Sequence, residues 1–191
     1  MPCTIRDAVP ADVPELVEII RTAFRDVAFR FGLTPENCPR HPSNCRQSWI
    51  EDALGKGVRY FILDAEGGSC GCVALEQASS ETCYLERLAV LPTHRRRGYG
   101  RALVVHALAE ARALGVKGVE IGLIAAQTEL RNWYRKLGFI DQKTASFPIC
   151  RFRSSFPVSL CQNDNDKEYP ACHSANLVPA RSRLRGKGNS R

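Results

Sequence analysis

The feature that most constrains the fold is a run of three strand-like segments that is followed by a helix and one further strand. The segments VRYFILDAEGG, SCGCVALEQ and TCYLERLAV begin at Val58 and are separated by Glu-Gly-Gly and Ser-Ser-Glu, which favour turns. Such short connections predict antiparallel neighbours, whereas the helical segment before VKGVEIGLI acts as a crossover and predicts a parallel pair. The sequence therefore indicates an α/β (α+β) fold with a mixed, largely antiparallel central sheet.

About four helices are expected to flank this sheet. After a short strand at 4–9, Asp12 and Glu15 have the spacing of a helix N-cap with an acid three residues later, and an apolar stripe follows at helical intervals. The proline-rich loop FGLTPENCPRHPSNC ends that helix and leads to a second one near 46–54. A third helix is expected over 98–114, ended by Gly115, and a fourth in QTELRNWYRKLGF, ended by Gly138.

The length of 191 residues with 44% hydrophobic residues suits one domain with its own core. Neither a leader-like N-terminus nor an apolar stretch of ~20 residues is visible, so a cytoplasmic location and no membrane partner are expected. The nine cysteines are odd in number and irregularly spaced, which favours mostly reduced thiols. Cys38, His41 and Cys45 raise the alternative of a zinc site, but no fourth ligand is evident and no metal is expected.

The net charge of +7 lies mostly near the end of the chain. Residues 1–146 hold 19 Lys and Arg against 17 Asp and Glu, a net charge of +2, whereas residues 147–191 hold 8 against 3, a net charge of +5. The body is thus almost neutral, which argues against a nucleic-acid binder. Residues 148–191 lack both helical and strand periodicity and are expected to form an atypical, poorly ordered basic tail.

The stretch LAVLPTHRRRGYGRAL combines three arginines with a Gly-x-Gly at the start of the third helix. A helix N-terminus offers unpaired backbone N–H groups and a partial positive charge, and glycines let a phosphate approach them. Arg95, Arg96 and Arg97 add charge at the same place, which indicates a pyrophosphate ligand. A P-loop is absent, and a dinucleotide turn is disfavoured because Leu103 stands where its third glycine or alanine is required.

Arg95-Arg96-Arg97-Gly98-Tyr99-Gly100 has the form Arg/Gln-x-x-Gly-x-Gly/Ala, preceded by a strand that ends in LAVLP and followed by LRNWYRKLGF. In this the chain, from Thr4 to about Phe147, resembles the GCN5-related N-acetyltransferase (GNAT) family. The resemblance implies the acyl-CoA N-acyltransferase fold, a GNAT acetyltransferase domain at 1–147 and acetyl-CoA as co-substrate. It implies transfer of the acetyl group to an amine by direct attack within a ternary complex.

The resemblance also assigns cofactor-binding positions. The backbone of one strand end would pair with the pantetheine arm, the arginine-rich loop would hold the pyrophosphate, and the cofactor would lie where the strands at 82–91 and 117–124 splay apart. The residues so implied are Leu88, Ala89 and Val90 for the arm, Arg95, Arg96, Arg97, Gly98, Tyr99, Gly100 and Arg101 for the pyrophosphate, and Asn132 as a further contact.

The resemblance matches Tyr134 to the tyrosine that protonates the departing thiolate. From the requirements of the reaction, Glu86 is a candidate base for the amine, directly or through water, and an N–H near 88–90 is a candidate oxyanion donor. Two structural alternatives remain open, because Glu86 could equally be an ion-pair partner and Tyr134 a tyrosine at the edge of the core. His94 and His106 are expected to lie in a loop and on a helix face rather than to act in catalysis.

The acceptor is expected to be a small-molecule or peptide amine, with a simple amine, an aminoglycoside-like polyamine and a protein amine all open, as is a homodimer. An alternative from another class is a weakly catalytic CoA-binding module whose basic tail binds RNA or another acidic partner.

The segment FPICRFRSSFPVSL is a poor version of the apolar strand that is expected to close the sheet. One hypothesis is a reading-frame shift. The spelling ATC TGC CGT TTC CGG TCA TCT TTC for Ile149 to Phe156, read one base earlier after CCC for Pro148, encodes the more strand-like HLPFPVIF. The gene sequence tests this hypothesis, because other codons would contradict it.

Overall fold

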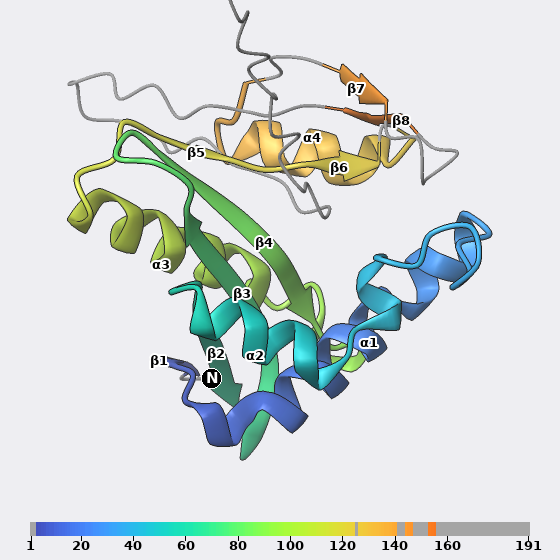
Figure 1. Cartoon of the computed structure of the whole chain (residues 1–191), viewed down its shortest axis with the longest axis horizontal. Coiled ribbons are helices and arrows are strands. Elements are labelled where there is room, and N and C mark those ends of the chain that lie inside the picture. The colour runs from blue at the N-terminus through green and yellow to red at the C-terminus, as the bar shows by residue number, and fades with distance from the viewer. Residues whose placement is uncertain (1–2, 125, 141–143, 147–152, 156–191) are drawn as a thin grey trace, which may run out of the picture.

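The computed structural model describes residues 3–124, 126–140, 144–146 and 153–155. Its main sheet has the strand order β1-β2-β3-β4-β5, in which β1 to β4 pair antiparallel and β4 pairs parallel with β5 (Figure 1). The strands span β1 Cys3–Asp7, β2 Arg59–Ala65, β3 Gly68–Gln77, β4 Thr82–Val90 and β5 Gly118–Glu120. The predicted mixed, largely antiparallel sheet with a parallel pair is therefore confirmed.

Four α-helices lie in the described part of the chain: α1 Val13–Arg30, α2 Gln47–Gly55, α3 Tyr99–Ala113 and α4 Thr128–Lys136. Short 3₁₀ turns, η1 Pro10–Asp12, η2 Pro42–Asn44 and η3 Pro92–His94, precede α1, α2 and α3. The helices cover both faces of the sheet. One core cluster joins the sheet to α3 and α4, and a second joins its other face to α1 and α2. Figure 1 shows α3 and α2 on opposite sides of β3 and β4.

The start of α1 differs from the sequence prediction. Asp12 precedes the helix, but its carboxylate does not cap it. It accepts instead from the backbone N–H of Val9 at 2.7 Å and from the guanidinium of Arg6 at 2.8 Å. An ion pair with Arg6 of β1, six residues earlier, and a bond to Val9 have thus taken the place of the capping interaction.

The segment 116–124, expected as one strand, is divided into β5 and β6 Leu123–Ile124. The register of β5 with β4 runs only from Thr82 opposite Gly118 to Tyr84 opposite Glu120. Beyond that point β6 joins a second sheet of order β6-β8-β7. The two parallel strands therefore separate after the third residue of β4, and Figure 1 shows them diverging, which is the predicted splay.

A β-bulge lies in β4 directly beyond the splay. Cys72 of β3 pairs with Ala89 and Ala74 pairs with Glu86, so that Val73 alone faces two residues of β4. One of these, Arg87, has φ of +49°, a left-handed conformation that is uncommon for a side chain of this size. The bulge shifts the alternation of the strand by one residue, so that Cys83 and Leu85 before it and Leu88 and Val90 after it lie on the same face of the sheet.

The end of the described chain contains β7 Thr144–Ser146 and β8 Arg153–Ser155. β8 lies antiparallel between β6 and β7. The segment expected to close the sheet therefore does so over three residues. The rest of the tail, with the frame-shift and RNA-binding hypotheses that depend on it, lies outside the described residues.

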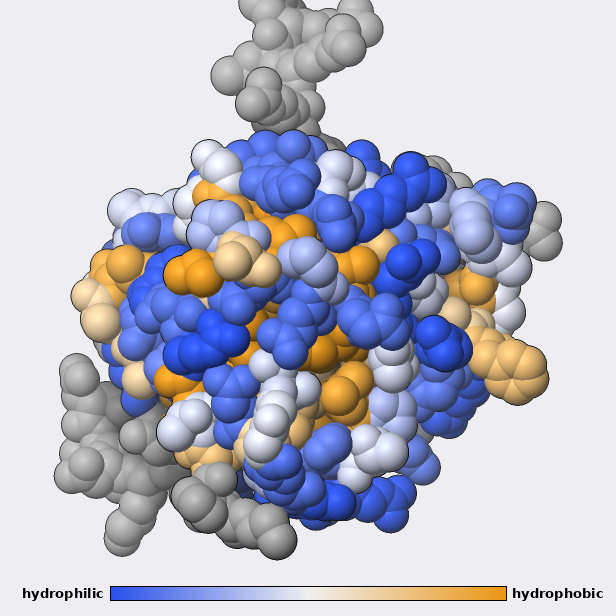
Figure 2. All heavy atoms as spheres, turned by 90° about the horizontal axis from the view of Figure 1, so that it is seen from below, coloured by the Kyte–Doolittle hydropathy of each residue, from blue (hydrophilic) through white to orange (hydrophobic). Residues whose placement is uncertain are grey.

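Three observations concern the described residues alone. No helix among them combines the length and the apolar character that a membrane span needs. The face seen from below in Figure 2 is mainly hydrophilic, with smaller hydrophobic areas between the polar side chains. Five cysteines are free thiols, namely Cys3, Cys45, Cys70, Cys72 and Cys83.

Gly71 of β3 lies close against the end of β4 and against α3. A Cβ atom there would lie 2.6 Å from the carbonyl oxygen of Ala89 and 3.2 Å from Leu103, so a neighbouring backbone would have to move. We expect Gly71→Ala to lower the free energy of unfolding by about 1–3 kcal/mol, as overpacking does. Gly68→Ala in the same strand is the matched control, because nothing lies within 4 Å of its added methyl group. Urea unfolding of both variants measures this difference, and equal stabilities would contradict the close approach.

Candidate active site

The bulge in β4 places two charged side chains on the α1/α2 face of the sheet. Glu86 pairs with Ala74, which belongs to the core cluster of that face, and Arg87 contacts Tyr60 of the same cluster. Leu88 packs against the opposite cluster, under α3. An acid and a base that are adjacent in sequence thus point to one side of the sheet, which a regular strand does not permit.

Glu86 lies in a largely desolvated position. Its side chain is 15% exposed, and burial, followed by repulsion from Glu76, raises its pKa to about 7. The nearest nitrogen of Arg87 lies 3.9 Å away, too far for a hydrogen bond. Among the described residues no group donates a hydrogen bond to this carboxylate. Glu86 can therefore exchange a proton near neutral pH, as a general base must.

Arg87 is the more deeply buried member of the pair. Its side chain is 11% exposed, and burial lowers the pKa of its guanidinium. One nitrogen donates to the hydroxyl of Tyr60, and the guanidinium lies 5.8 Å from the centre of that ring. The positive charge of Arg40 also acts on it. The guanidinium remains charged in this setting, because arginine does not lose its proton in proteins.

The loop after β4 is held to α1 by Arg95. Its guanidinium donates to Asp26 at 2.5 Å and to the carbonyl oxygen of Ala23 at 2.6 Å, and its Nε donates to the carbonyl oxygen of Val90 at 3.2 Å. Arg95 therefore joins three segments and shapes the loop, while its charge is largely matched by Asp26.

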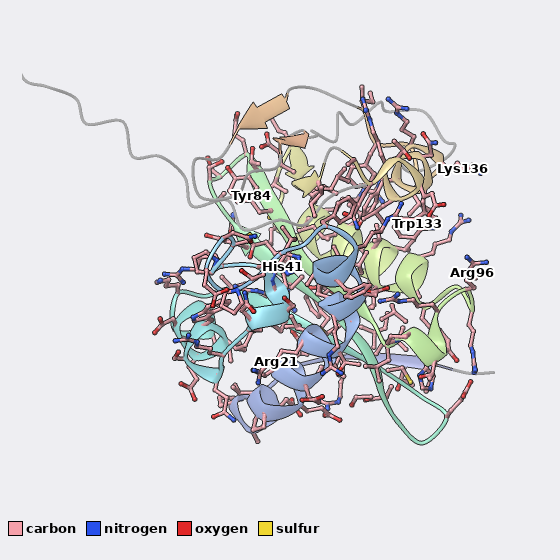
Figure 3. All side chains as sticks on the ribbon, turned by 90° about the vertical axis from the view of Figure 1, so that its right-hand side faces the viewer. Arg21, His41, Tyr84, Arg96, Trp133 and Lys136 are labelled. Atoms are coloured by element: carbon pink, nitrogen blue, oxygen red, sulfur yellow. The ribbon has the colours of Figure 1, made fainter. Side chains whose placement is uncertain are left out.

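The other two arginines differ in their surroundings. Arg97 donates to Glu66 in the β2–β3 turn and to the carbonyl oxygen of Thr93 at 3.2 Å. Tyr99 donates to the same carboxylate at 3.4 Å. Arg96 has φ of +61° and makes no such contact within the described chain, and Figure 3 shows it projecting from the loop at the edge of the molecule. Arg96 is thus the arginine of this loop that is most available to a ligand.

The start of α3 presents backbone donors next to this loop. Gly98 precedes the helix with φ of +87°, and the first turn leaves the N–H groups of Tyr99, Gly100 and Arg101 without acceptors among the described residues. Nothing lies within 4 Å of the place where a side chain on Gly98 would begin. This open cradle of N–H groups at the positive end of a helix suits an anion.

The helix α4 lies against the same end of α3. The ring of Trp133 would be 3.7 Å from a Cβ atom on Gly100, and Figure 3 places Trp133 on the side of α4 that faces α3. Tyr134 is 2% exposed, in edge-to-face contact with Trp133 at 4.6 Å between ring centres. Asn132 is exposed and accepts from Arg135 at 3.3 Å.

The three described histidines outside the β4 bulge have separate surroundings. His41 is buried, its Nδ1 lies 2.8 Å from the hydroxyl of Ser43, and burial lowers its pKa to about 4. His94 lies in η3, and its Nε2 atom is 3.7 Å from the carboxylate of Glu66. His106 belongs to α3 and packs its ring edge-to-face against Phe61 of β2. In the part of the chain that the structure describes, no group of three or more His, Cys, Asp or Glu side chains could hold a metal ion.

The segment that builds this arrangement is similar to known proteins. Residues 56–141 match the family model described as an acetyltransferase (GNAT) domain. The chain contains a domain of the GNAT family. The match covers all of β2 to α4, and so includes the bulge, the splay, the arginine-rich loop and the start of α3.

Solved structures show the same fold as this GNAT domain. The protein yncA of Salmonella typhimurium, solved with its cofactor acetyl-CoA, has 22% sequence identity, a TM-score of 0.64 and covers 90% of this chain and 100% of its own. The N-acetylglutamate synthase of Neisseria gonorrhoeae, solved with coenzyme A and N-acetyl-glutamate, has 25% identity, a TM-score of 0.54 and covers 76% of this chain but 29% of its own. The predicted acyl-CoA N-acyltransferase fold is thereby confirmed.

Curated relatives are similar in sequence but often longer. An amino-acid acetyltransferase of Neisseria meningitidis is 27% identical over 149 residues, which cover 78% of this chain and 30% of the relative. The uncharacterized N-acetyltransferase YjgM of Escherichia coli is 26% identical over 131 residues, 67% of this chain and 76% of the relative. The chain thus spans about a third of the length of the amino-acid acetyltransferase.

The site brings together most of the predicted positions. The strand end at 88–90, the loop at 95–97 and the start of α3 follow one another around the splay, and α4 with Tyr134 packs beside them. Sequence reasoning missed Arg87, Asp26 and Glu66. The bulge that turns Arg87 inward depends on the register of β3, and the partners of Arg95 and Arg97 are 69 and 31 residues away, so no local pattern reveals them.

The raised pKa of Glu86 predicts a dependence of stability on pH. Since the folded state holds this proton more tightly than the unfolded chain, the stability it contributes is present below pH 4.5 and is lost as the pH rises to about 7. We expect Glu86→Gln to stabilise the protein at pH 8 by up to about 3 kcal/mol and to change little at pH 4. Glu51→Gln on the exposed face of α2 is the control. Unfolding curves at both pH values measure this, and equal effects at pH 4 and 8 would contradict the desolvated carboxylate.

Proposed function

We propose that the protein is an N-acetyltransferase that moves an acetyl group from acetyl-CoA to an amine by direct attack within a ternary complex. The observation that carries the proposal is the position of Glu86. This carboxylate, with a pKa near 7, stands beside the bulge of β4, two residues after the last pairing of β4 with β5, and the open anion cradle follows the same strand at the start of α3. Such a site offers an amine-binding base and a pyrophosphate site on the two sides of one strand end.

The residues around the splay fit acetyl-CoA. The unpaired N–H groups of Tyr99, Gly100 and Arg101 and the exposed guanidinium of Arg96 would hold the pyrophosphate. Arg95 and Arg97 would act differently, since their side chains keep the loop in shape through Asp26 and Glu66. The backbone edge of β4 from Leu88 to Val90 has no strand on the β5 side among the described residues, and would pair with the pantetheine arm.

Acetyl-CoA supplies the activated acetyl group as a thioester. Glu86 takes a proton from the ammonium form of the acceptor, directly or through water, and so leaves a nitrogen lone pair. A C–N bond to the acetyl carbon then forms, and the C–S bond breaks. An N–H at 88–90 stabilises the charge that develops on the carbonyl oxygen. Tyr134 donates a proton to the CoA thiolate, and the second proton of the nitrogen passes through water to the phenolate of Tyr134 as the amide forms, which restores the acid.

Amino acids are the first acceptors to test, because a curated relative is named an amino-acid acetyltransferase. Small amines, polyamines and peptides follow. Asn132 is proposed as a further contact of the cofactor, on α4. A cytoplasmic location, the domain limits of 1–147, a homodimer and the lack of nucleic-acid, membrane and metal partners stay predictions.

The direct test is thiol release from acetyl-CoA with a panel of amines. We expect intersecting initial-velocity lines, because both substrates must be bound before transfer. We also expect kcat/KM to fall about tenfold per pH unit below pH 7 as Glu86 becomes protonated. In Glu86→Gln this limb should be lost together with most of the activity, about 10²–10⁴-fold.

Other outcomes distinguish the alternatives. Parallel initial-velocity lines would contradict direct attack, because they indicate an acetylated enzyme. Binding of acetyl-CoA without transfer to any amine would contradict the enzymatic proposal and favour the CoA-binding module.

The anion cradle predicts that Gly98 is needed for cofactor binding. Gly98→Ala forces a side chain into φ of +87° and should lower stability by about 1–2 kcal/mol. Gly115→Ala at the far end of α3 is a matched control, with φ of +74° and nothing within 4 Å. We expect both variants to lose similar stability, but only Gly98→Ala to lose the rise in Tm that acetyl-CoA causes. An unchanged rise in Gly98→Ala would contradict a pyrophosphate at this helix start.

A further inference from the structure

We propose that Arg87 binds the carboxylate of the acceptor, and that the acceptor is therefore a free α-amino acid whose amine faces Glu86. This inference rests on the proposed acetyl transfer and deepens it. It assigns a ligand to a buried charged group that the acetyl-transfer step itself does not require.

The hydrogen-bonding capacity of Arg87 is mostly unused. A guanidinium has five N–H donors. Within the described chain one nitrogen of Arg87 bonds to the hydroxyl of Tyr60, and Glu86 lies beyond hydrogen-bond distance at 3.9 Å. A largely buried cation with so few acceptors is costly, and it is the arrangement expected where a ligand supplies the missing anion. A carboxylate fits best, because its two oxygens match two parallel N–H groups of the guanidinium.

The neighbouring Glu86 fixes the kind of carboxylate. The Oε2 atom of Glu86 lies 3.9 Å from the Nη1 atom of Arg87. An acceptor that binds both side chains must therefore carry its amine and its carboxylate close together. In an α-amino acid a single carbon separates the amine from the carboxyl group. Such an acceptor reaches both side chains at once, with its amine on Glu86 and its carboxylate on Arg87. The amine of a peptide N-terminus or of a polyamine brings no carboxylate to this position.

The charges around the pair support this polarity. Arg40, in the loop before α2, adds positive potential at Arg87. Arg21, on α1, adds positive potential nearby, because Arg21 and Arg87 both act to lower the pKa of Cys45. Figure 3 shows Arg21 on α1 and His41 on the loop that follows it. Glu76 adds negative potential at Glu86. The site is thus divided into an anion-binding part and a cation-binding part.

The backbone supplies an independent reason. Arg87 occupies a left-handed conformation, φ of +49°, at the bulge of β4. A regular strand would turn this side chain toward the opposite core under α3. Strained residues of this kind are maintained at ligand sites more often than elsewhere. Contact with Tyr60 alone would not require a charged residue in this left-handed conformation, because an apolar side chain packs on a tyrosine ring without the cost of burying a charge.

The experiment compares an α-amino acid with its own carboxamide as acceptors of the wild-type protein. The amide keeps the side chain and the amine but loses the negative charge. We expect the acid to have the higher kcat/KM by roughly 10- to 100-fold, the usual range for a charged hydrogen bond. In Arg87→Gln this preference should disappear, mainly through a higher KM for the acid. Arg87→Lys should restore part of it, because it keeps the charge but not the paired donors.

Controls separate the outcomes. Arg112→Gln, in the last turn of α3, should keep the wild-type preference. A rise in Tm with acetyl-CoA shows that Arg87→Gln is folded, and the acid-to-amide ratio of the wild type tests the inference even if that variant does not fold. Equal rates with acid and amide in the wild type would overturn the inference and leave the proposed function standing. A wild-type protein that acetylates no amine would overturn the proposed function, and the inference with it.

Discussion

The divergence of β4 from β5 is the constraint on which the rest of the site depends. Three paired positions hold the strands together, and then β6 leaves for another sheet. The backbone edge of β4 is thereby left open for a ligand that can complete it. The bulge follows at once, so the open edge and the inward-turned charges lie within a few residues of each other. One strand end thus serves both substrates of the proposed reaction.

The arginine-rich loop shows how a basic run can divide its tasks. Arg95 ties the loop to α1, Arg97 ties it to the β2–β3 turn, and Arg96 stays exposed. The two ion pairs lie near the surface, so each contributes little to global stability. Their effect is geometric, because they position the first turn of α3 and its unpaired N–H groups. Preorganised donors bind an anion at a lower entropic cost than a mobile loop does.

Burial has opposite effects on the two charges at the bulge. It raises the pKa of Glu86 into the neutral range and so makes a carboxylate useful as a base. It cannot neutralise Arg87, whose charge must be met by an anion. The structural alternative of a Glu86 ion pair is thus only partly satisfied at 3.9 Å, and both groups keep bonding capacity for a substrate.

The sequence by itself determined the order of strands and helices, the crossover that makes β4 and β5 parallel, and the glycine-bounded start of α3. These are local patterns, and local periodicity and turn residues report them. Only the tertiary structure decided that 116–124 is two strands, that Asp12 binds Arg6, and that Arg87 turns beside Glu86. The division of 116–124 and the turn of Arg87 depend on strands that are distant in the chain, and the Asp12–Arg6 pair depends on how β1 meets the start of α1. Register, long-range ion pairs and desolvation arise only when the sheet is assembled.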